Sequence, residues 1–461
     1  MKKVYLAMIN TWAWLLKHVL TEKVMMWIML KYCYYYARRG KKNQDAIIWG
    51  NTPVINIKYW SRALVKAGYK SYTLVPNFLG SINKKQDFDY YYDDIIPARI
   101  RKSWFWNTLF WYQVNYPEVK KFWAVLHIMK NARIYHVYYD GGPLAKTKYW
   151  RHEAVLLKRA GVRLIGTVFG SDFYMYSRIR DLSIRHALNA YYPFFGTGEK
   201  YIKERVDYWN EHLDAVPGGF ITDGRTRWDI LLSNPICIDT ASWQPKREYS
   251  DHDGINGEVT IVHLSNHPPY TGTEFIKKAI EELKSEGLKI DFFYPEKRIQ
   301  NDEFKKKLQE TDIVIDGILF SGYGLVAIEA MASGSCVISN LESRELLEVF
   351  RRYSWLNEAP ILSASPETIK ERIRALIINP RLRKSLGTAG RAYVEKYHSE
   401  KNMLYWFGKL YDKIIKGEQV DLMYLYHPLL PDSYNNMSPK VVHPLAENRI
   451  PDQVQMQDMI D

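Results

Sequence analysis

The sequence predicts an α/β protein with two domains, each a parallel β-sheet covered by helices. Three observations support this class. Apolar runs rich in β-branched residues alternate with segments of helical length, first over residues 44–233 and again over residues 234–416. Several of these runs end at a glycine turn that leads into a helix, as the strands of parallel sheets often do. The chain of 461 residues is long enough for two such domains.

Residues 1–43 are expected to form a separate N-terminal helical segment. Two apolar and aromatic runs, Val4–Leu16 and Val24–Ala37, are followed by Arg38 and Arg39. Each run is shorter than the roughly 20 residues that a membrane-spanning helix needs, and the lack of a small-residue cleavage site argues against a signal peptide. Two interpretations stay open: an amphipathic segment in the headgroup layer of an anionic membrane, or a helix packed on the protein body or on a second copy.

The first domain, residues 44–233, should bind its ligand beyond the carboxyl ends of its strands. Strands are expected at residues 46–51, 71–75, 132–139 and 163–169, and helices at residues 53–68, 100–112 and 150–160. The polar and glycine residues at the strand ends are Gly50, Asn51, Asp140 and Asp172, and His136 lies within the third strand. Because the strands are parallel, we expect the turns after them to lie on one edge of the sheet.

The second domain, residues 234–416, repeats the alternation. Strands are expected at residues 259–264, 290–294, 312–320 and 336–339, and helices at residues 303–309, 325–332, 367–378, 381–397 and 402–415. Thr271 and Glu274 have the spacing of a capping box, which predicts that a helix begins there. Residues 417–461 are rich in Pro, Asn, Asp and Met without a helical or strand period, which indicates an extended tail.

The stretch from Asp312 to Ser339 has the strongest functional signal. An apolar strand is followed by a glycine turn, residues 321–324, and then by a helix of small residues. The first amides of a helix have no partner inside it, and the helix dipole favours negative charge there, so this turn predicts an anion site. Glu329 lies about one turn further on and could accept hydrogen bonds from sugar or ribose hydroxyls.

The string GYGLVAIEAMASGSCVIS resembles the donor-site motif of glycosyltransferase family 4 and related retaining enzymes of group 1. The resemblance implies the GT-B fold, in which two Rossmann-like domains with parallel sheets face a cleft. It also implies that Glu329 holds the ribose hydroxyls of a nucleotide-sugar donor and that the turn amides face its diphosphate. The donor-binding residues are then Asn266, Thr271, Ser321, Gly322, Tyr323, Gly324, Leu325 and Glu329.

The resemblance extends to the first domain and has departures in the second. IYHVYYDGG and AVLLKRAGVRLIGTVFGSD are similar to the family pattern in which His136 and Asp172 take catalytic positions, with Gly50, Asn51 and Asp140 on the acceptor side. Phe169 stands where many members have His. The family's Arg and Lys in the turn before residue 272 correspond to Pro268 and Thr271, and Ser321 replaces a Glu.

Composition limits the classes of ligand and partner that this chain is expected to bind. The formal net charge of +13 suits nucleotide phosphates or an anionic membrane, whereas no nucleic-acid-binding motif is present. The three cysteines form no CxxC pair, which argues for a reducing compartment and against a zinc site. No aspartate pair lies in a context that suits a metal, so we expect neither metal nor cofactor, with the nucleotide-sugar as substrate.

Three functions follow as hypotheses. The first is a glycosyltransferase at the cytoplasmic face of the membrane that builds a surface polysaccharide or glycolipid. The second is a degenerate GT-B protein that binds a partner or a glycan without turnover, which the missing Arg, Lys and Glu favour. The third is a nicotinamide-dependent enzyme, since Gly322, Gly324 and Ala327 also fit the dinucleotide pattern GxGxxG/A.

Overall fold

The computed structural model describes residues 22–78, 80, 83–96, 117–170, 172–220, 222–295, 299, 301–430, 434 and 440–445. Two predicted elements, Val4–Leu16 and Ile100–Tyr112, lie outside these residues. The chain divides into two compact units: the first is Met1–Asp172 with Glu204–Val216, and the second is Phe173–Lys203 with Pro217–Asp461. These packing units do not test the domain bounds predicted from the sequence, which stay predictions.

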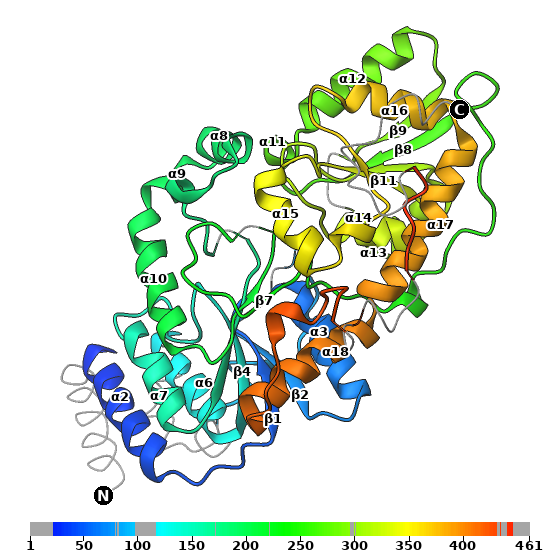
Figure 1. Cartoon of the computed structure of the whole chain (residues 1–461). Helices are drawn as coiled ribbons and strands as arrows, with labels where there is room; N and C mark the ends of the chain where they lie inside the picture. The colour runs from blue at the N-terminus through cyan, green and yellow to red at the C-terminus, as the bar shows by residue number, and fades with distance from the viewer. Residues whose placement is uncertain are drawn as a thin grey trace, which may run out of the picture. The chain divides into compact units, whose positions relative to one another are not determined.

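The first unit is built on a parallel sheet of five strands in the order β3-β2-β1-β4-β5 (Figure 1). Its strands are β1 (Ala46–Trp49), β2 (Ser71–Val75), β3 (Tyr90–Tyr91), β4 (Ala132–Tyr138) and β5 (Arg163–Thr167). The central strand β1 pairs with β2 and β4, and every residue of β1 is buried. A strand buried on both faces must be apolar throughout, which is why AIIW reads as a continuous hydrophobic run.

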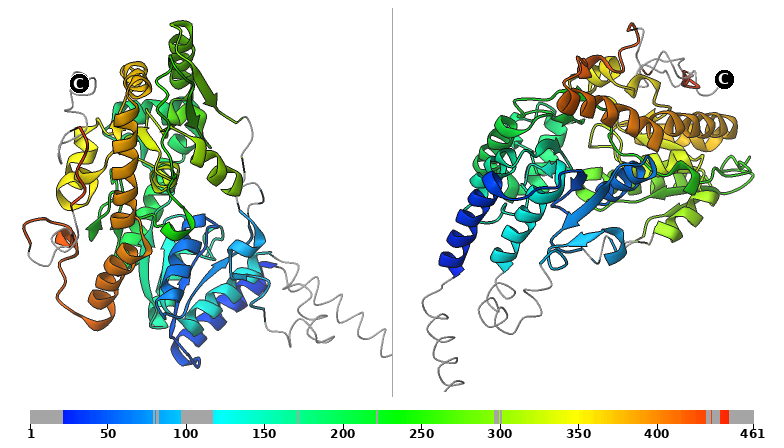
Figure 2. Two further views of the ribbon diagram at one scale, coloured as in Figure 1. Left: turned by 90° about the vertical axis from the view of Figure 1, so that its right-hand side faces the viewer. Right: turned by 90° about the horizontal axis from the view of Figure 1, so that it is seen from below.

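Helices cover this sheet and join its strands. They are α3 (Ile55–Lys66), α6 (Pro117–Asn131), α7 (Glu153–Arg159) and α10 (Glu199–His212). The first residues of α10 belong to the second unit and the rest to the first. Two short 3-10 turns are η1 (Lys85–Asp87) and η2 (Trp150–His152). A further helix, α2 (Glu22–Arg39), packs alongside α6 and α7 (Figures 1 and 2). Of the two interpretations of the N-terminal segment, packing on the protein body is therefore confirmed for the inner face of α2.

The second unit has its own parallel five-stranded sheet, in the order β12-β11-β10-β8-β9. Its strands are β8 (Val259–His263), β9 (Ile290–Phe293), β10 (Ile313–Ile315), β11 (Cys336–Ser339) and β12 (Leu362–Ser363), and a small separate pair is formed by β6 (Pro217–Gly218) and β7 (Ile230–Leu231). The strand order changes direction beside β10 and β8. In an open α/β sheet such a switch point is where a crevice for ligands forms.

The helices of the second unit lie between and after these strands. They are α8 (Leu182–Tyr191), α9 (Pro193–Thr197), α11 (Pro268–Thr271), α12 (Thr273–Ser285), α13 (Asn301–Glu310), α14 (Leu325–Ala332), α15 (Arg344–Tyr353), α16 (Ile369–Ile378), α17 (Pro380–Tyr397) and α18 (Glu400–Tyr411). The single-turn pieces are η3 (Tyr176–Arg178), η4 (Thr240–Ser242), η5 (Leu356–Glu358), η6 (Asp412–Lys416, π-helical) and η7 (Leu422–Tyr424).

Two parallel sheets with connecting helices make this an α/β protein of the Rossmann-like type, as predicted. One buried cluster of aliphatic side chains forms the core of the second unit, with members from α12, α16 and the inner faces of β8, β10 and β11. The parts of residues 417–445 that the structure describes are not a free tail. Tyr426 is fully buried and donates a hydrogen bond to Asn402 Oδ1 (2.7 Å), and Tyr434 donates one to the carbonyl of Lys396 (3.1 Å).

Two predictions of local structure are wrong. The strand expected over residues 312–320 ends at Ile315. Beyond it, the amide of Ile318 bonds to the carbonyl of Thr271, and the carbonyl of Gly317 accepts from the amide of Asn340, so the regular pairing of the sheet does not continue. The capping box of Thr271 and Glu274 is also absent. The two prolines of α11 start a separate helical turn that includes Thr271. Helix α12 begins only after Gly272, which is its N-cap residue and has a φ of 81°.

None of the helices in the described part of the chain combines the length and the apolar content that crossing a bilayer requires.

Close backbone packing between α17 and the turn before β11 gives a stability test. A methyl group at Gly387 would lie 2.1 Å from the carbonyl oxygen of Gly334, whereas one at Gly408 in α18 would meet nothing within 4 Å. Gly387→Ala should lower the free energy of unfolding by about 1–3 kcal/mol because backbone atoms cannot move aside. Gly408→Ala should raise it by roughly 0.5–1 kcal/mol through helix propensity alone.

Denaturant unfolding of both variants measures the two changes against wild type. Equal effects of the two substitutions would show that α17 does not pack against the backbone of Gly334.

Candidate functional site

The end of β10 positions the glycine turn. After Ile315 the chain leaves the sheet, but hydrogen bonds to the end of β11 still hold it. The amide of Asp316 bonds to the carbonyl of Ile338 (2.9 Å), and the amide of Gly322 bonds to the carbonyl of Asn340 (2.8 Å). Ser339 Oγ donates to the carbonyl of Gly322 (2.6 Å). The turn is thus fixed beside the carboxyl ends of two central strands.

Gly322 must be glycine for two reasons. Its φ of 133° lies where residues with a side chain are strained, and a Cβ atom there would lie 2.7 Å from the ring of Phe220. The neighbouring Ser321, which stands where the family has Glu, donates a hydrogen bond from Oγ to Asp181 Oδ2 (3.1 Å). Asp181 is the N-cap of α8, accepting from the amides of Ser183 and Ile184. The serine therefore joins the turn to α8.

A carboxylate accepts a hydrogen bond from the first amide of the predicted anion site. The amide of Gly324 donates to Asp316 Oδ2 at 2.6 Å, and burial raises the pKa of Asp316 to about 6. The amides of the first turn of α14, from Leu325 onward, have no partner within the helix. The sequence predicted open amides facing a diphosphate, but the structure shows that one of them already binds an acidic side chain.

Tyr323 contributes its backbone to the turn and its side chain to the core. Its hydroxyl is hydrogen-bonded to Tyr393 (2.8 Å) and His398 (2.9 Å) and accepts from Trp355 Nε1 (3.2 Å). The carbonyl of Tyr323 accepts from Asn234 Nδ2 (2.7 Å). This buried network holds the turn in place, and the role of Tyr323 in donor binding stays a prediction.

Glu329 is the most unusual side chain of the second unit. It lies on α14, is 5% exposed, and burial raises its pKa to about 8. Within the described part of the chain no group donates a hydrogen bond to its carboxyl, and Lys305 is the cation that lowers its pKa. A buried carboxyl without a hydrogen-bond partner costs stability, so such a group is a candidate for binding hydroxyls of a ligand.

The turn after β8 forms the other side of this edge. His263 is buried and its pKa is lowered to about 4 by burial, so it is neutral. Its Nδ1 donates to the carbonyl of Ile315 (2.8 Å), and its Nε2 accepts from Thr273 Oγ1 (2.8 Å), since a carbonyl can only accept. Thr271 Oγ1 donates to Ser265 Oγ (2.7 Å). Asn266 is exposed at this turn.

Cations near this edge differ from the family pattern. Pro268 and Thr271 are not basic, as the sequence indicated, and the exposed His267 bonds to the hydroxyl of Tyr192 (2.9 Å). Lys277 Nζ lies 4.5 Å from the ring centroid of Tyr294, which stacks on His263, the last residue of β8. This position makes Lys277 a candidate for holding phosphate.

In the first unit, His136 is a core residue. It is 1% exposed, its ring stacks on Trp49 at a centroid distance of 3.6 Å, and burial holds its pKa well below the usual value. Asp172 is also buried and accepts from the amides of Tyr139 (3.2 Å) and Gly170 (3.0 Å). Burial raises the pKa of Asp172 to about 8. Both predicted catalytic residues therefore have structural contacts, and their catalytic role stays a prediction.

Asp140, Asn51 and Gly50 do come together at the carboxyl edge of the first sheet. Thr52 Oγ1 donates to Asp140 Oδ2 (2.9 Å), and Asn51 Nδ2 lies 3.4 Å from the carbonyl of Gly141. Burial raises the pKa of Asp140. The backbone of Gly50 lies so close to β2 that a Cβ atom on Gly50 would be 2.5 Å from the carbonyl oxygen of Leu74.

Sequence reasoning missed three residues of this acceptor-side cluster: Tyr92, Glu153 and Arg205. The Tyr92 hydroxyl bonds to Asn51 Oδ1, and Arg205 donates to the carbonyls of Asp140 and Ala145. Glu153 is fully buried, burial raises its pKa to about 8, and its Oε1 has no hydrogen-bond partner among the described residues. Glu153 and Arg205 lie far in sequence from the strand ends, so no local pattern indicates them, whereas Tyr92 directly follows the unpredicted strand β3.

The described residues contain no group of three or more His, Cys, Asp or Glu side chains that could hold a metal ion. The expectation that the reaction needs no metal stays a prediction.

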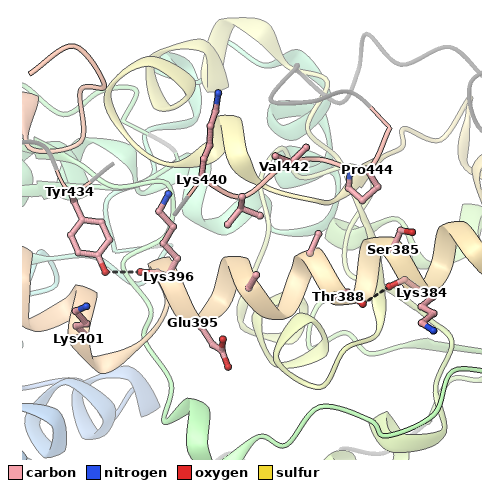
Figure 3. Close-up of a pocket in the computed structure, with 13 residues that line it drawn as sticks. Lys384, Ser385, Thr388, Glu395, Lys396, Lys401, Tyr434, Lys440, Val442 and Pro444 are labelled. Atoms are coloured by element: carbon pink, nitrogen blue, oxygen red, sulfur yellow. Dashed lines mark hydrogen bonds between the residues drawn. The ribbon is translucent and has the colours of Figure 1, made fainter. Parts of the chain in front are cut away.

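A separate groove lies between α17 and the C-terminal residues 440–444 (Figure 3). Its volume is about 770 Å³, and Lys384, Lys396, Lys401 and Lys440 lie around it with Tyr434. Lys396 Nζ is bonded to Glu358 Oε2 at 2.8 Å, so its charge is compensated by the protein. No residue of the glycine turn or of α14 lines this groove.

Comparison with protein families assigns the glycine-turn region. Residues 271–393 match the family model of glycosyl transferases group 1. We call residues 271–393 the group 1 segment. It contains the glycine turn, Glu329 and Lys277, and it ends within α17. The family resemblance stated from the sequence is thereby confirmed for group 1, whereas family 4 in particular is not.

Solved structures are similar to this chain at low sequence identity. A sucrose-phosphate synthase from Thermosynechococcus elongatus has 12% identity and a TM-score of 0.47, with 82% of this chain and 100% of that chain covered. HepE of Anabaena, in complex with UDP, has 11% identity and a TM-score of 0.47, with coverages of 80% and 100%. No curated protein matches the sequence. Likeness at these levels assigns no activity to the group 1 segment.

The pKa of Glu329 gives a test of its environment. Its folded value of about 8 exceeds the ordinary 4.5, so stability contributed by the neutral form is present below pH 4.5 and is lost as the pH rises through 8. Glutamine does not ionise. Glu329→Gln should therefore raise the thermal midpoint by roughly 2–4 °C at about pH 8.5 and change it little at about pH 5.

Thermal unfolding at both pH values measures this difference. Glu345→Gln, an exposed glutamate on α15, is the matched control and should show no such dependence on pH. A Glu329→Gln variant that is equally destabilised at both pH values would mean that the carboxyl makes a stabilising contact in the folded protein.

Proposed function

We propose that this chain is a nucleotide-sugar-dependent glycosyltransferase that moves a hexose to a glycan or lipid-linked acceptor in surface polysaccharide or glycolipid synthesis. The observation that carries the proposal is Glu329. It is a buried carboxyl with a raised pKa and no hydrogen-bond donor among the described residues, one turn after a glycine turn inside the group 1 segment. Ribose hydroxyls would supply the donors that the protein does not.

The second unit would bind the donor. In the transfer the bond between the anomeric carbon and the diphosphate oxygen breaks, a bond from that carbon to an acceptor hydroxyl oxygen forms, and the hydroxyl proton is released. Negative charge grows on the departing diphosphate, so groups that stabilise it lower the barrier. The candidates are the amides at the start of α14 and Lys277, in place of the Arg and Lys that the family carries at Pro268 and Thr271.

The first unit would bind the acceptor. Asp140, Asn51 and the hydroxyl of Thr52 lie together at the carboxyl edge of its sheet, where they could bond to the hydroxyls of a sugar. Retention of the anomeric configuration, without a dedicated protein nucleophile and without metal, belongs to this proposal. So does a place at the inner face of the cell membrane, as a peripheral protein.

A second candidate function has one specific observation in its favour. Asp316 accepts from the amide of Gly324, which places a carboxylate where a diphosphate would be expected. Together with the missing cations, this favours a degenerate protein of the same fold that binds a glycan or a partner without turnover. Nucleotide binding separates the two candidates, because only the transferase requires a nucleoside diphosphate.

The first experiment is thermal unfolding of the purified protein with UDP, GDP, ADP, CMP and NAD. One nucleoside diphosphate should raise the midpoint, since a ligand that binds only the folded state stabilises it. Glu329→Ala should weaken binding of that nucleotide at least about tenfold, because two hydrogen bonds to a carboxyl are lost. Glu345→Ala is the control. No shift with any nucleoside diphosphate would favour the non-catalytic candidate, and a shift with NAD alone would favour a nicotinamide enzyme.

Asp316 gives a prediction of opposite sign. At about pH 7.5 its carboxyl, with a pKa of about 6, is ionised, holds the amide of Gly324 and repels a diphosphate. Asp316→Asn should therefore tighten nucleoside diphosphate binding by about three- to tenfold at that pH, and by less at about pH 5. Calorimetric titration measures both affinities.

Asp251→Asn, an exposed aspartate of the second unit, controls for the change in net charge. Weaker binding by Asp316→Asn at both pH values would instead show that the carboxyl of Asp316 contacts the donor directly.

A further inference from the structure

The face of α2 that points away from the protein has an unusual composition. Five large apolar or aromatic side chains on this helix are exposed, among them Trp27 at 53% and Tyr35 at 57%. We call the exposed side of the helix the outer face of α2. Its residues are Lys23, Val24, Trp27, Ile28, Lys31, Tyr32, Tyr35, Arg38 and Arg39. Scattered apolar residues are normal on a surface, but a contiguous group on one helix indicates a contact.

Packing of α2 on the protein does not need this face. The opposite side of the helix buries Met25, Met26, Met29, Leu30, Cys33 and Ala37, and it packs on α6 and α7. Tyr34 adds a hydrogen bond to His152 Nδ1 at 2.8 Å. A helix that is fixed by its inner face usually has a polar outer face. The apolar residues of the outer face therefore serve something other than the fold.

The charge of the outer face is of one sign. It contains four cations, Lys23, Lys31, Arg38 and Arg39, and no described acidic side chain. Lys31 Nζ lies 5.5 Å from the ring centroid of Trp27, so a cation and an indole ring stand side by side. The whole chain carries a formal charge of +13. A partner for this face should be apolar in part and negatively charged.

A bilayer surface that contains anionic lipids fits these properties better than a protein does. Trp and Tyr favour the boundary between headgroups and acyl chains, and Lys and Arg bind the lipid phosphates. Protein interfaces, by contrast, are depleted in Lys at their centres. The sequence immediately upstream continues the same composition, with the apolar run Val4–Leu16 followed by Lys17.

We propose that the outer face of α2 docks on a bilayer surface that carries anionic lipids. Trp27, Ile28 and Tyr35 would enter the headgroup layer, and the basic residues beside them would bind lipid phosphates. This inference gives a residue-level basis to the membrane location in the proposed function. It concerns lipid binding alone. A failure of lipid binding would therefore leave the proposed nucleotide binding untouched, and a failure of nucleotide binding would leave this inference untouched.

Co-sedimentation with vesicles tests the proposal with the full chain and no nucleotide. The probes are vesicles of phosphatidylcholine alone and vesicles of phosphatidylcholine with about one third phosphatidylglycerol, at low and at high salt. We expect binding to the anionic vesicles, little binding to the neutral ones, and weaker binding at high salt. The double variant Trp27→Glu with Tyr35→Glu should bind the anionic vesicles at least about tenfold more weakly.

The control is Phe275→Glu with Lys278→Glu, which changes an aromatic residue of 47% exposure and an exposed lysine on α12. It alters the charge more than the test variant does, and it should bind vesicles like wild type. Circular dichroism and the thermal midpoint show that both variants are folded. Equal vesicle binding by the test variant and wild type overturns the proposal, and so does wild-type protein that does not bind anionic vesicles. A change in oligomeric state caused by the test variant would instead identify a protein interface.

Discussion

The hydrogen bonds between residues 316–322 and the end of β11 determine the geometry of the second unit's carboxyl edge. The amide of Asp316 bonds to Ile338, and the amide of Gly322 bonds to Asn340. Because these bonds hold the chain after it leaves the sheet, Gly322 is forced to a positive φ against Phe220, and α14 must begin at Leu325. The position of Glu329 follows from that start. The start of α14, the glycine turn and the position of the Glu329 carboxyl therefore all depend on these hydrogen bonds to the end of β11.

Buried carboxyls without full compensation mark both carboxyl edges. Glu329 in the second unit and Glu153 and Asp172 in the first each have a pKa raised to about 8 by burial. Burying a group that would rather ionise lowers the stability of the folded state, and carboxyls with a raised pKa are therefore candidates for binding a ligand. Their location beyond the carboxyl ends of parallel strands is where ligands of such sheets bind. The two observations agree, and each rests on different evidence.

The glycine turn and α2 show two different uses of exposed or uncompensated groups. Asp316 takes the amide of Gly324 and so satisfies a donor that a bound anion would otherwise use, which stabilises the turn while no nucleotide is bound. The apolar side chains of the outer face of α2 are instead open to solvent. Trp27 and Tyr35 are exposed although six apolar side chains of the same helix are buried. The first group has its partner within the chain, and for the second we propose a bilayer surface as the partner.

Local pattern was enough to predict most strands and helices, because period and length are properties of short segments. Four strands of each sheet were predicted, whereas the short edge strands β3 and β12 were not. The glycine turn, Glu329, Asp140 and Asn51 were named as site residues. The tertiary structure decided what local pattern cannot contain. Asp316 was read as part of a strand, yet it caps a turn eight residues away, and Glu153 and Arg205 reach Asp140 only through folding. His136 was a catalytic candidate by motif, but stacking on Trp49 places it in the core. The sequence by itself determined the fold class and the position of the glycine turn, since both depend on residue order. Burial, and with it the protonation of each carboxyl, depends on neighbours distant in the chain, and only the tertiary structure decides it.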